Sequence, residues 1–144
     1  MRLWHEALIP LLPRQQLLGQ HRECCALRGL GWGKPQSTVN YVFKHPYAWL
    51  VVYHKKVMNE MEERGYTVDF RWYDANYRGK TAGYDHVLEV TDSPSWLWSA
   101  VYEKDTLGLL YKTTIYPEHN EKYLNECLEN LARKGIVINK EDIQ

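Results

Sequence analysis

Proline and glycine divide this chain into three segments in which apolar residues recur every three to four positions. Proline begins each segment and glycine follows it, over residues 13–29, 46–65 and 117–135. Proline fits the first turn of a helix, and glycine is favoured just beyond the last turn. The sequence therefore predicts three helices with these bounds, of which the third covers residues 117–134.

Two of these segments have a clear apolar stripe. The second places Leu50, Tyr53, Val57 and Met61 on one face of a helix and Lys55 away from that face. The third has the narrowest stripe, which indicates a helix that covers the core. Its members are Tyr123, Leu124, Cys127, Leu128 and Leu131.

The rest of the chain is less regular. Residues 66–84 have no period and are expected to form an ordered irregular segment, whereas residues 85–116 leave room for a short β-hairpin. The length of 144 residues suits one domain with its own core. We therefore predict a mainly α, compact single-domain fold over residues 1–144.

Composition excludes several classes of protein. Hydrophobic residues make up 44% and charged residues 25%, which is ordinary for a globular chain. The longest apolar run, residues 48–53, is far shorter than a membrane span, and the N-terminus has no signal-peptide core. Three cysteines, two of them adjacent, do not suggest a disulfide scaffold. We expect a cytoplasmic protein without a membrane partner, and the sequence leaves its oligomeric state open.

The charge is unevenly distributed, although the total is zero. Residues 1–56 contain eight Lys or Arg and two acidic residues, a net charge of +6, whereas residues 73–144 carry −4. A basic N-terminal part is the expected footprint of a polyanion-binding site. Chance clustering of solvated charges explains it equally well, so charge alone leaves both interpretations open.

The first predicted helix has the most distinctive polar face. Its outer side presents Gln15, Gln16, Gly19, Arg22 and Glu23. Glycine inside a helix costs about 1 kcal/mol relative to alanine, so a close approach to the backbone would explain Gly19. The approaching group is either a ligand or a second helix that crosses at this point.

Residues 14–23, Arg-Gln-Gln-Leu-Leu-Gly-Gln-His-Arg-Glu, resemble the first catalytic helix of the pyrimidine-dimer DNA glycosylases, the phage-type ultraviolet endonucleases. Arg2 stands close to the N-terminus, as an Arg does in that family. Similar elements follow in the same order at residues 38–43, 58–66 and 77–79. The resemblance covers residues 1–80, which would form the catalytic helical part. The chain looks like a bacterial branch of the family, and its acidic C-terminal part, residues 81–144, diverges from the phage-type enzymes.

This resemblance implies a glycosylase that also cleaves abasic sites, acts on damaged double-stranded DNA and needs no metal or other cofactor. In that family the α-amine of the chain forms a Schiff base with C1′ of the damaged nucleotide, and β-elimination then cuts the strand. The amine maps onto Met1 and the essential carboxylate onto Glu23. The Arg residues that hold phosphates map onto Arg2 and Arg22.

The chemistry of the residues agrees with this assignment. An α-amino group has a pKa near 8, far below that of lysine, so part of it is unprotonated at neutral pH. A carboxylate must stabilise the cationic sugar and move protons, and Glu6 and Glu23 are the only two in the first 59 residues. The expected DNA-contacting residues are Arg2, Gln15, Gln16, Arg22, Arg28, Lys34 and Lys44.

Five further residues fit this hypothesis without independent support. Lys55 and Lys56 are either additional phosphate contacts or solvated charges. Trp4, Trp32 and Tyr41 are candidates to stack on a displaced nucleotide.

Other functions have weaker support. His5, His21, His45 and His54 lack metal-ligand spacing, so no metal site is expected, and Cys24 beside His21 suggests core packing rather than a nucleophile. The alternative to an enzyme is a non-catalytic nucleic-acid or protein-binding module on the same fold. The enzyme requires the α-amine, the helix carboxylate and an Arg to converge in an open cleft, whereas the module requires only the positive face.

Overall fold

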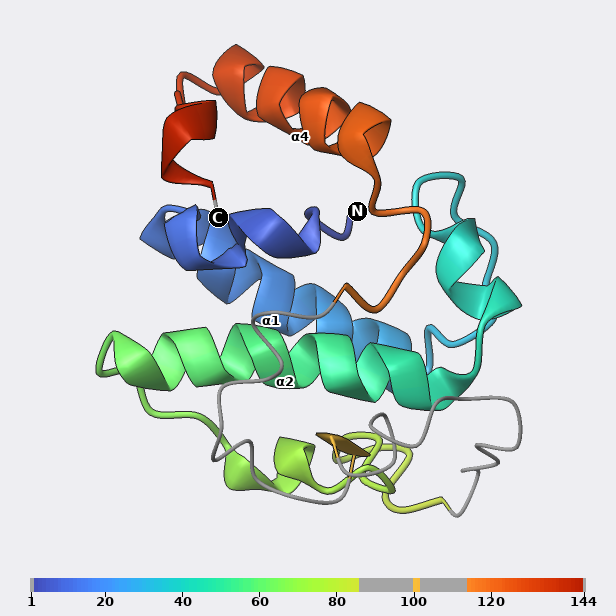
Figure 1. Cartoon of the computed structure of the whole chain (residues 1–144). Helices are drawn as coiled ribbons and strands as arrows, with labels where there is room; N and C mark the ends of the chain where they lie inside the picture. The colour runs from blue at the N-terminus through green and yellow to red at the C-terminus, as the bar shows by residue number, and fades with distance from the viewer. Residues whose placement is uncertain (1, 86–99, 102–113, 144) are drawn as a thin grey trace.

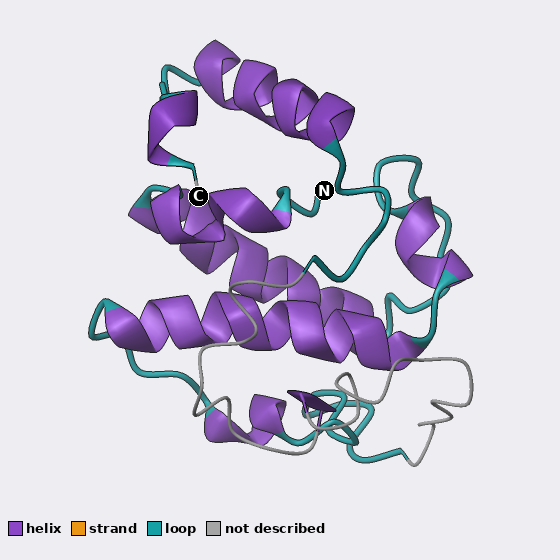
Figure 2. Cartoon of the chain, in the orientation of Figure 1, coloured by secondary structure: helices purple, strands orange, loops and turns teal. Residues whose placement is uncertain are grey.

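The computed structural model describes residues 2–85, 100–101 and 114–143, which form a mainly helical structure (Figures 1 and 2). The α-helices are α1 (Arg14–Arg28), α2 (Tyr47–Glu63) and α4 (Glu121–Arg133). Shorter 3-10 helices are η1 (Glu6–Leu11), η2 (Asn40–Lys44), η3 (Phe70–Tyr73) and η5 (Lys140–Asp142). The described residues contain no strand, only an isolated bridge between Tyr77 and Tyr84. The predicted helical fold is confirmed, and most of the segment predicted as a β-hairpin lies outside the described residues.

Proline and glycine locate the first two helices correctly. Pro13 and Pro46 stand directly before α1 and α2, and Gly29 follows the last residue of α1. Gly65 follows the end of α2 with a φ of +88°, which glycine adopts without the strain that a side chain would cause. These two helices therefore begin and end where local backbone chemistry requires.

The third helix begins later than its proline predicts. Pro117 lies in a turn, and α4 starts at Glu121. The side chain of Asn120 accepts a hydrogen bond of 2.9 Å from the backbone N–H of Tyr123, which caps the helix. The side-chain cap, not the proline, therefore sets the start of α4.

Helix α2 is the centre of the core. It runs across the molecule with the N-terminal segment and α1 on one side and η3 on the other (Figure 1). The predicted stripe of Leu50, Tyr53, Val57 and Met61 is buried, and so are most other positions of the helix. No helix in the described part of the chain combines the length and apolarity needed to cross a bilayer.

Two lysines of α2 are buried rather than solvated. Lys55 donates to the backbone oxygens of Ala100 (2.8 Å) and Val101, and burial lowers its pKa to about 8. Lys56 donates to Oε1 of Glu6 at 2.8 Å. The prediction that these lysines are phosphate contacts or solvated charges is therefore wrong, because both ammonium groups have partners inside the protein.

The start of the chain is fixed between α1, α2 and α4. The Tyr53 hydroxyl of α2 donates to the Trp4 carbonyl at 2.6 Å, and the Tyr123 hydroxyl of α4 donates to the Leu3 carbonyl. The Trp4 N–H donates to Oε1 of Gln20 on α1 at 2.6 Å. These contacts hold the N-terminal segment against the first half of α1.

Candidate active site

A cleft of about 350 Å³ opens where the N-terminal segment lies against α1. Four residues predicted from the sequence to act on DNA line it, together with the glycine of the same helix face: Arg2, Gln15, Gln16, Gly19 and Glu23. The sequence did not assign a role in the site to most of the other lining residues, which are Trp4, Gln20, Thr38, Asn130 and Lys134. The polar face of α1 and the beginning of the chain thus meet in one hollow.

The carboxylate of Glu23 faces the start of the chain. Its Oε2 accepts a hydrogen bond of 3.2 Å from the backbone N–H of Arg2 and one of 3.1 Å from Nε2 of Gln20. Burial raises the pKa of the Glu23 carboxyl, and the hydrogen bonds, the α-amine charge and Lys134 offset that rise only in part. A carboxylate with a raised pKa is a stronger base than an exposed one.

Gln20 joins the N-terminal segment to this carboxylate. Its Nε2 donates to the Arg2 carbonyl at 3.0 Å as well as to Glu23. Its Oε1 accepts from Trp4 N–H and shares the Tyr53 hydroxyl proton, at an O–O distance of 2.8 Å, with the Trp4 carbonyl. The side chain is buried, and the amide oxygen and both amide protons are bonded. No local pattern predicts this role of Gln20, because it depends on contacts between segments far apart in the chain.

Gly19 faces the cleft and not a second helix. A Cβ built on it would come within 4 Å of one side-chain atom among the described residues, Nη2 of Arg22 at 3.7 Å. No other described helix crosses there, so the helix-crossing explanation is wrong. The absent side chain leaves room for a ligand to approach the backbone of α1.

The opposite wall of the cleft comes from α4. Asn130 and Lys134 line it, and Nζ of Lys134 lies 5.4 Å from the centroid of the Trp4 ring. The sequence assigned α4 to the core, and its stripe residues Leu124, Cys127 and Leu131 are indeed buried. The polar end of the same helix additionally brings a cation to the site.

A family model for pyrimidine dimer DNA glycosylases matches residues 1–74, which include the N-terminal segment, α1 and α2. The chain belongs to this family. No curated protein and no solved structure gives a significant match. Family membership implies binding to DNA and glycosylase activity on pyrimidine dimers, and the cleft gathers the carboxylate and the Arg that the family resemblance had mapped onto Glu23 and Arg2.

The remaining basic residues predicted for this glycosylase family member occupy three different places. Arg22 is exposed one turn after Gly19, at the rim of the cleft. Lys34 is exposed and lines a second pocket beyond the end of α1. Lys44 is exposed at the end of η2 and lines neither pocket.

Arg28 is not available to DNA. Its side chain is fully buried, and its guanidinium donates to Tyr47 Oη, to His54 Nδ1 and to the backbone oxygens of Trp72, Asp74 and Tyr77. These bonds attach residues 72–77 to the end of α1. The prediction of a phosphate contact at Arg28 is therefore wrong, because the core occupies its donors.

Glu6 has a structural partner and does not face the cleft. It is buried, its Oε1 accepts from Nζ of Lys56 at 2.8 Å, and its two oxygens accept from the backbone N–H groups of residues 115–116. Burial alone would raise the pKa of Glu6, but hydrogen bonds and charge from His119 and Lys56 lower it to about 2. Of the two carboxylates in the first 59 residues, only Glu23 can therefore reach a substrate.

The three aromatic residues proposed for stacking are engaged within the protein. Trp4 is buried beneath Lys134, and the ring of Trp32 packs edge-on against Tyr47. The hydroxyl of Tyr41 lies 2.7 Å from His119 Nε2 in the core between α2 and α4. All three rings therefore have packing partners within the protein; Trp4 is buried, and Trp32 and Tyr41 are half-buried.

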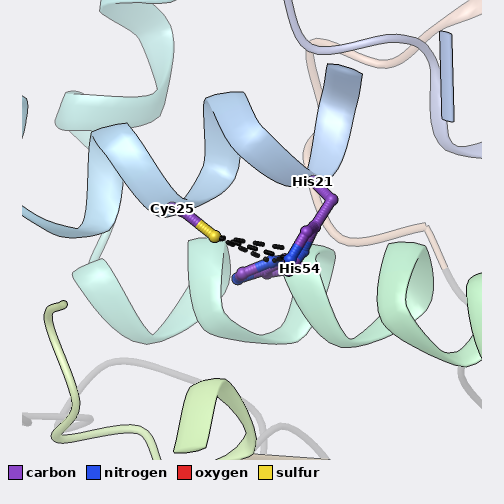
Figure 3. Close-up of side chains that lie close together, drawn as sticks. All are labelled: His21, Cys25 and His54. Atoms are coloured by element: carbon purple, nitrogen blue, oxygen red, sulfur yellow. Dashed lines mark hydrogen bonds between the residues drawn. The ribbon is translucent and has the colours of Figure 1, made fainter. Parts of the chain in front are cut away.

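A second cluster of reactive side chains, His21, Cys25 and His54, lies between α1 and α2 (Figure 3). Nδ1 of His21 is 2.7 Å from Nε2 of His54, and the Cys25 sulfur is 3.8–3.9 Å from the ring nitrogens. Burial lowers the pKa of both imidazoles, most strongly that of His54, and raises the pKa of the Cys25 thiol to about 12. The thiolate needed for nucleophilic catalysis is therefore disfavoured.

Hydrogen bonding in this cluster does not suit a metal ion. Arg28 donates to Nδ1 of His54 at 2.9 Å, and because arginine only donates, the proton of the neutral ring is on Nε2. That proton is donated to His21, so the nitrogen that would ligate a metal carries hydrogen. Two imidazole nitrogens on tetrahedral zinc are also about 3.3 Å apart, wider than this pair. The cluster is therefore a buried polar contact between the two helices.

Proposed function

We propose that this protein excises damaged pyrimidines from double-stranded DNA and cleaves the resulting abasic site through its own α-amine. The observation that carries the proposal is the hydrogen bond from the Arg2 N–H to Glu23 inside an open cleft. It places the helix carboxylate beside the start of the chain, as the enzyme requires and the binding module does not.

Covalent geometry extends this argument to Met1, which lies outside the described residues. The α-nitrogen is three bonds from the Arg2 nitrogen and so stays within about 4 Å of it. The Arg2 nitrogen is itself 3.2 Å from the Glu23 carboxylate. The amine and the carboxylate can therefore act on neighbouring carbons of the same sugar.

The proposed reaction uses these two groups in sequence. The unprotonated amine attacks C1′, the bond from C1′ to the base breaks, and the departing base takes up a proton. Loss of one amine proton leaves a glycosylamine, whose C1′–O4′ bond then breaks as O4′ takes up a proton, which gives the protonated imine. Glu23 next removes a proton from C2′, and the bond from C3′ to the phosphate oxygen breaks. The raised pKa of Glu23 supports its role as the base.

The cleft supplies cations for the phosphates beside the reacting sugar. Arg2 and Lys134 line it from opposite walls, and Arg22 is exposed at its rim. The amides of Gln15 and Gln16 offer neutral donors on the same helix face, where Gly19 admits a close approach. Arg28 is buried and cannot contact DNA, and we propose that Lys134 supplies a phosphate-binding charge from α4 in its place.

Borohydride trapping tests the proposed chemistry. The untagged protein is mixed with a duplex that carries one abasic site, reduced, digested and mapped; a protein acetylated at its α-amine is the control. We expect a covalent complex on Met1 that acetylation abolishes. A complex mapped to a lysine would overturn the assignment of the amine. Salt-sensitive DNA retention without any complex would support the non-catalytic module instead.

The role of α4 has its own test, which compares two adjacent cations. Lys134 lines the cleft, whereas Arg133 is exposed and does not. Lys134→Ala is expected to weaken DNA binding. It should also reduce the magnitude of the slope of log K against the logarithm of the salt concentration (the salt slope) by about one, the value for one lost phosphate contact. Arg133→Ala should leave both unchanged. Equal effects of the two variants, measured by fluorescence anisotropy at several salt concentrations, would contradict the assignment.

A further inference from the structure

A second pocket of about 420 Å³ lies beyond the end of α1. The turn that follows α1 forms one side, residues 78–82 form the other, and Lys34, Arg78 and Lys80 contribute its charges. None of its lining residues in the described part of the chain is acidic. The pocket thus offers a basic surface that the proposed reaction does not use.

The two pockets lie along the same side of α1. Gln15, Gly19, Arg22 and Ala26 follow one another at spacings of four, three and four residues, which places them on one helix face. Gln15 and Gly19 line the first cleft, Ala26 lines the second pocket, and the exposed Arg22 stands between them. A linear polyanion lying along this face would meet both pockets and the Arg that separates them.

The end of α1 is built so that it does not repel an anion. Helix C-termini carry partial negative charge on their last carbonyl groups. Here the Cys25 and Ala26 carbonyls accept from the N–H groups of Gly29 (3.0 Å) and Gly31 (2.9 Å), and the Arg28 carbonyl accepts from Nε of Arg78 (2.7 Å). These bonds occupy three of the last four carbonyl oxygens of α1 and reduce the negative potential that an anion would meet there.

Two glycines bring the walls of this pocket together. A Cβ on Gly29 would lie 2.9 Å from the Arg78 carbonyl, and one on Gly31 would lie 2.7 Å from the Ala26 carbonyl, both too close for a side chain. Glycine at position 29 therefore lets the turn after α1 pack against Arg78, and glycine at position 31 lets the same turn fold back onto the end of α1. The pocket is a defined part of the fold.

Lys34 and Lys80 are the cations most available to a ligand. Both are exposed, whereas Arg78 is held by the Arg28 carbonyl, the Tyr47 ring and Asp85. Asp69, whose carboxyl is influenced by the charge of Lys80, pairs with Arg71 at 2.6 Å. Among the described residues neither lysine forms a salt bridge, so both ammonium groups are open to a partner in solution.

We infer that one strand of the substrate duplex runs along α1 and that Lys34 and Lys80 bind its backbone phosphates in the second pocket. The ten residues from Gly19 to Gly29 span about 15 Å of helix, and a duplex whose axis is parallel to α1 advances about 3.4 Å per nucleotide. The second contact thus falls about four nucleotides from the reacting sugar. This inference rests on the proposed function, because it takes the first cleft as the place of the damaged nucleotide.

The first test needs no variant, because it changes the DNA. Wild-type protein is titrated with an abasic-site duplex that has twelve base pairs on each side, and with two duplexes shortened to two base pairs on the 5′ or the 3′ side. We expect one shortened duplex to bind with a salt slope of log K lower by about two, for two lost phosphate contacts, and the other to bind as the long duplex does. Equal loss with both, or with neither, would overturn the inferred path.

The second test links that flank to the two lysines. Lys34→Ala/Lys80→Ala should lower the salt slope by about two on the long duplex and have no effect on the sensitive short one. Lys122→Ala, at an exposed lysine of α4 outside both pockets, is the control and should bind the long duplex as wild type does. If the double variant binds the long duplex as wild type does, the inference is wrong. Failure of borohydride trapping would instead reject the proposed chemistry and leave these binding results to stand on their own.

Discussion

Replacing Glu23 with Gln should reduce strand cleavage at an abasic site by a factor of about 10²–10⁴, the range that a positioned general base contributes. Gln keeps the shape of the side chain and an oxygen that accepts the Arg2 N–H, so the N-terminal segment should stay in place. Binding to the same duplex should remain within a few-fold of wild type, because the variant removes a negative charge and no phosphate contact. Single-turnover cleavage and anisotropy measure the two quantities separately.

The pH dependence distinguishes a base from a residue that merely supports the fold. Cleavage by wild type should fall as the pH drops through the pKa of Glu23, which burial places above its ordinary value of 4.5. A second decline, from protonation of the α-amine, should occur near pH 8. Glu23→Gln should lose the lower transition and keep the upper one. A variant that keeps both transitions would show that another group is the base.

Thermal unfolding supplies a control for the same variant. The pKa of Glu23 is higher in the folded than in the unfolded protein, so ionisation of this carboxyl destabilises the fold. This destabilisation is absent at a pH below the pKa of the unfolded state and complete at a pH above the pKa of the folded state. Glu23→Gln should therefore have an unchanged or higher Tm at pH 7, which is typical of a residue kept for function. Glu126→Gln, the same charge change at an exposed position of α4, should alter neither cleavage nor Tm. A large fall in Tm for Glu23→Gln would point to a structural role.

Local sequence signals were sufficient for α1 and α2 but not for α4. Pro13 and Pro46 mark the starts of α1 and α2 because each stands at the N-cap, and no side chain there caps the helix with a hydrogen bond. At the third helix, the side chain of Asn120 accepts a hydrogen bond from a free N–H of the first turn. The helix therefore starts at Glu121, four residues after Pro117. An Asn directly before a run of periodic apolar residues is itself a signal for the start of a helix, and in this segment it locates the start better than the proline does.

The α1 side of the cleft could be predicted because helical spacing is a local property. It puts Gln15, Gly19 and Glu23 on one face whatever the rest of the chain does. Gln20 and Lys134 could not be predicted, since their roles depend on where the N-terminal segment and α4 pack. Only the tertiary structure shows that α4 completes the cleft.

Charged residues were misinterpreted where their partners are distant in sequence. Arg28 and Lys55 bond backbone carbonyls from other segments, and a sequence gives no sign of such acceptors. A charge in a helix is usually solvated, which is why the exposed interpretation came first. Only the tertiary structure shows that backbone carbonyls surround these two side chains and accept their hydrogen bonds when they are buried.

The buried pair of Glu6 and Lys56 should make the largest single contribution to stability that variants can test. Their Oε1–Nζ distance is 2.8 Å, and each side chain is about 95% buried. Lys56→Met removes the closest cation of a buried carboxylate, leaving His119 Nδ1 at 3.1 Å from its other oxygen, and should lower the free energy of unfolding by about 3–5 kcal/mol. Glu6→Gln/Lys56→Met should recover part of that loss, because neither charge then remains. Urea unfolding followed by circular dichroism measures each value.

The pH dependence of Glu6→Gln gives the sharper form of this prediction. The folded pKa of Glu6 is about 2 against an ordinary 4.5, so its contribution of about 3 kcal/mol is present above pH 4.5 and is lost as the pH falls through 2. The gap between wild type and Glu6→Gln should therefore be largest near pH 7 and close towards pH 2. Glu121→Gln, which breaks an exposed pair with Lys140, should change stability by less than about 1 kcal/mol at any pH.

Because Glu6 also binds the backbone of residues 115–116, which lead into α4, its loss should loosen the wall that carries Lys134 and weaken DNA binding as well. A Glu6→Gln protein as stable as wild type at pH 7 would show that this pair does not hold the two parts of the chain together.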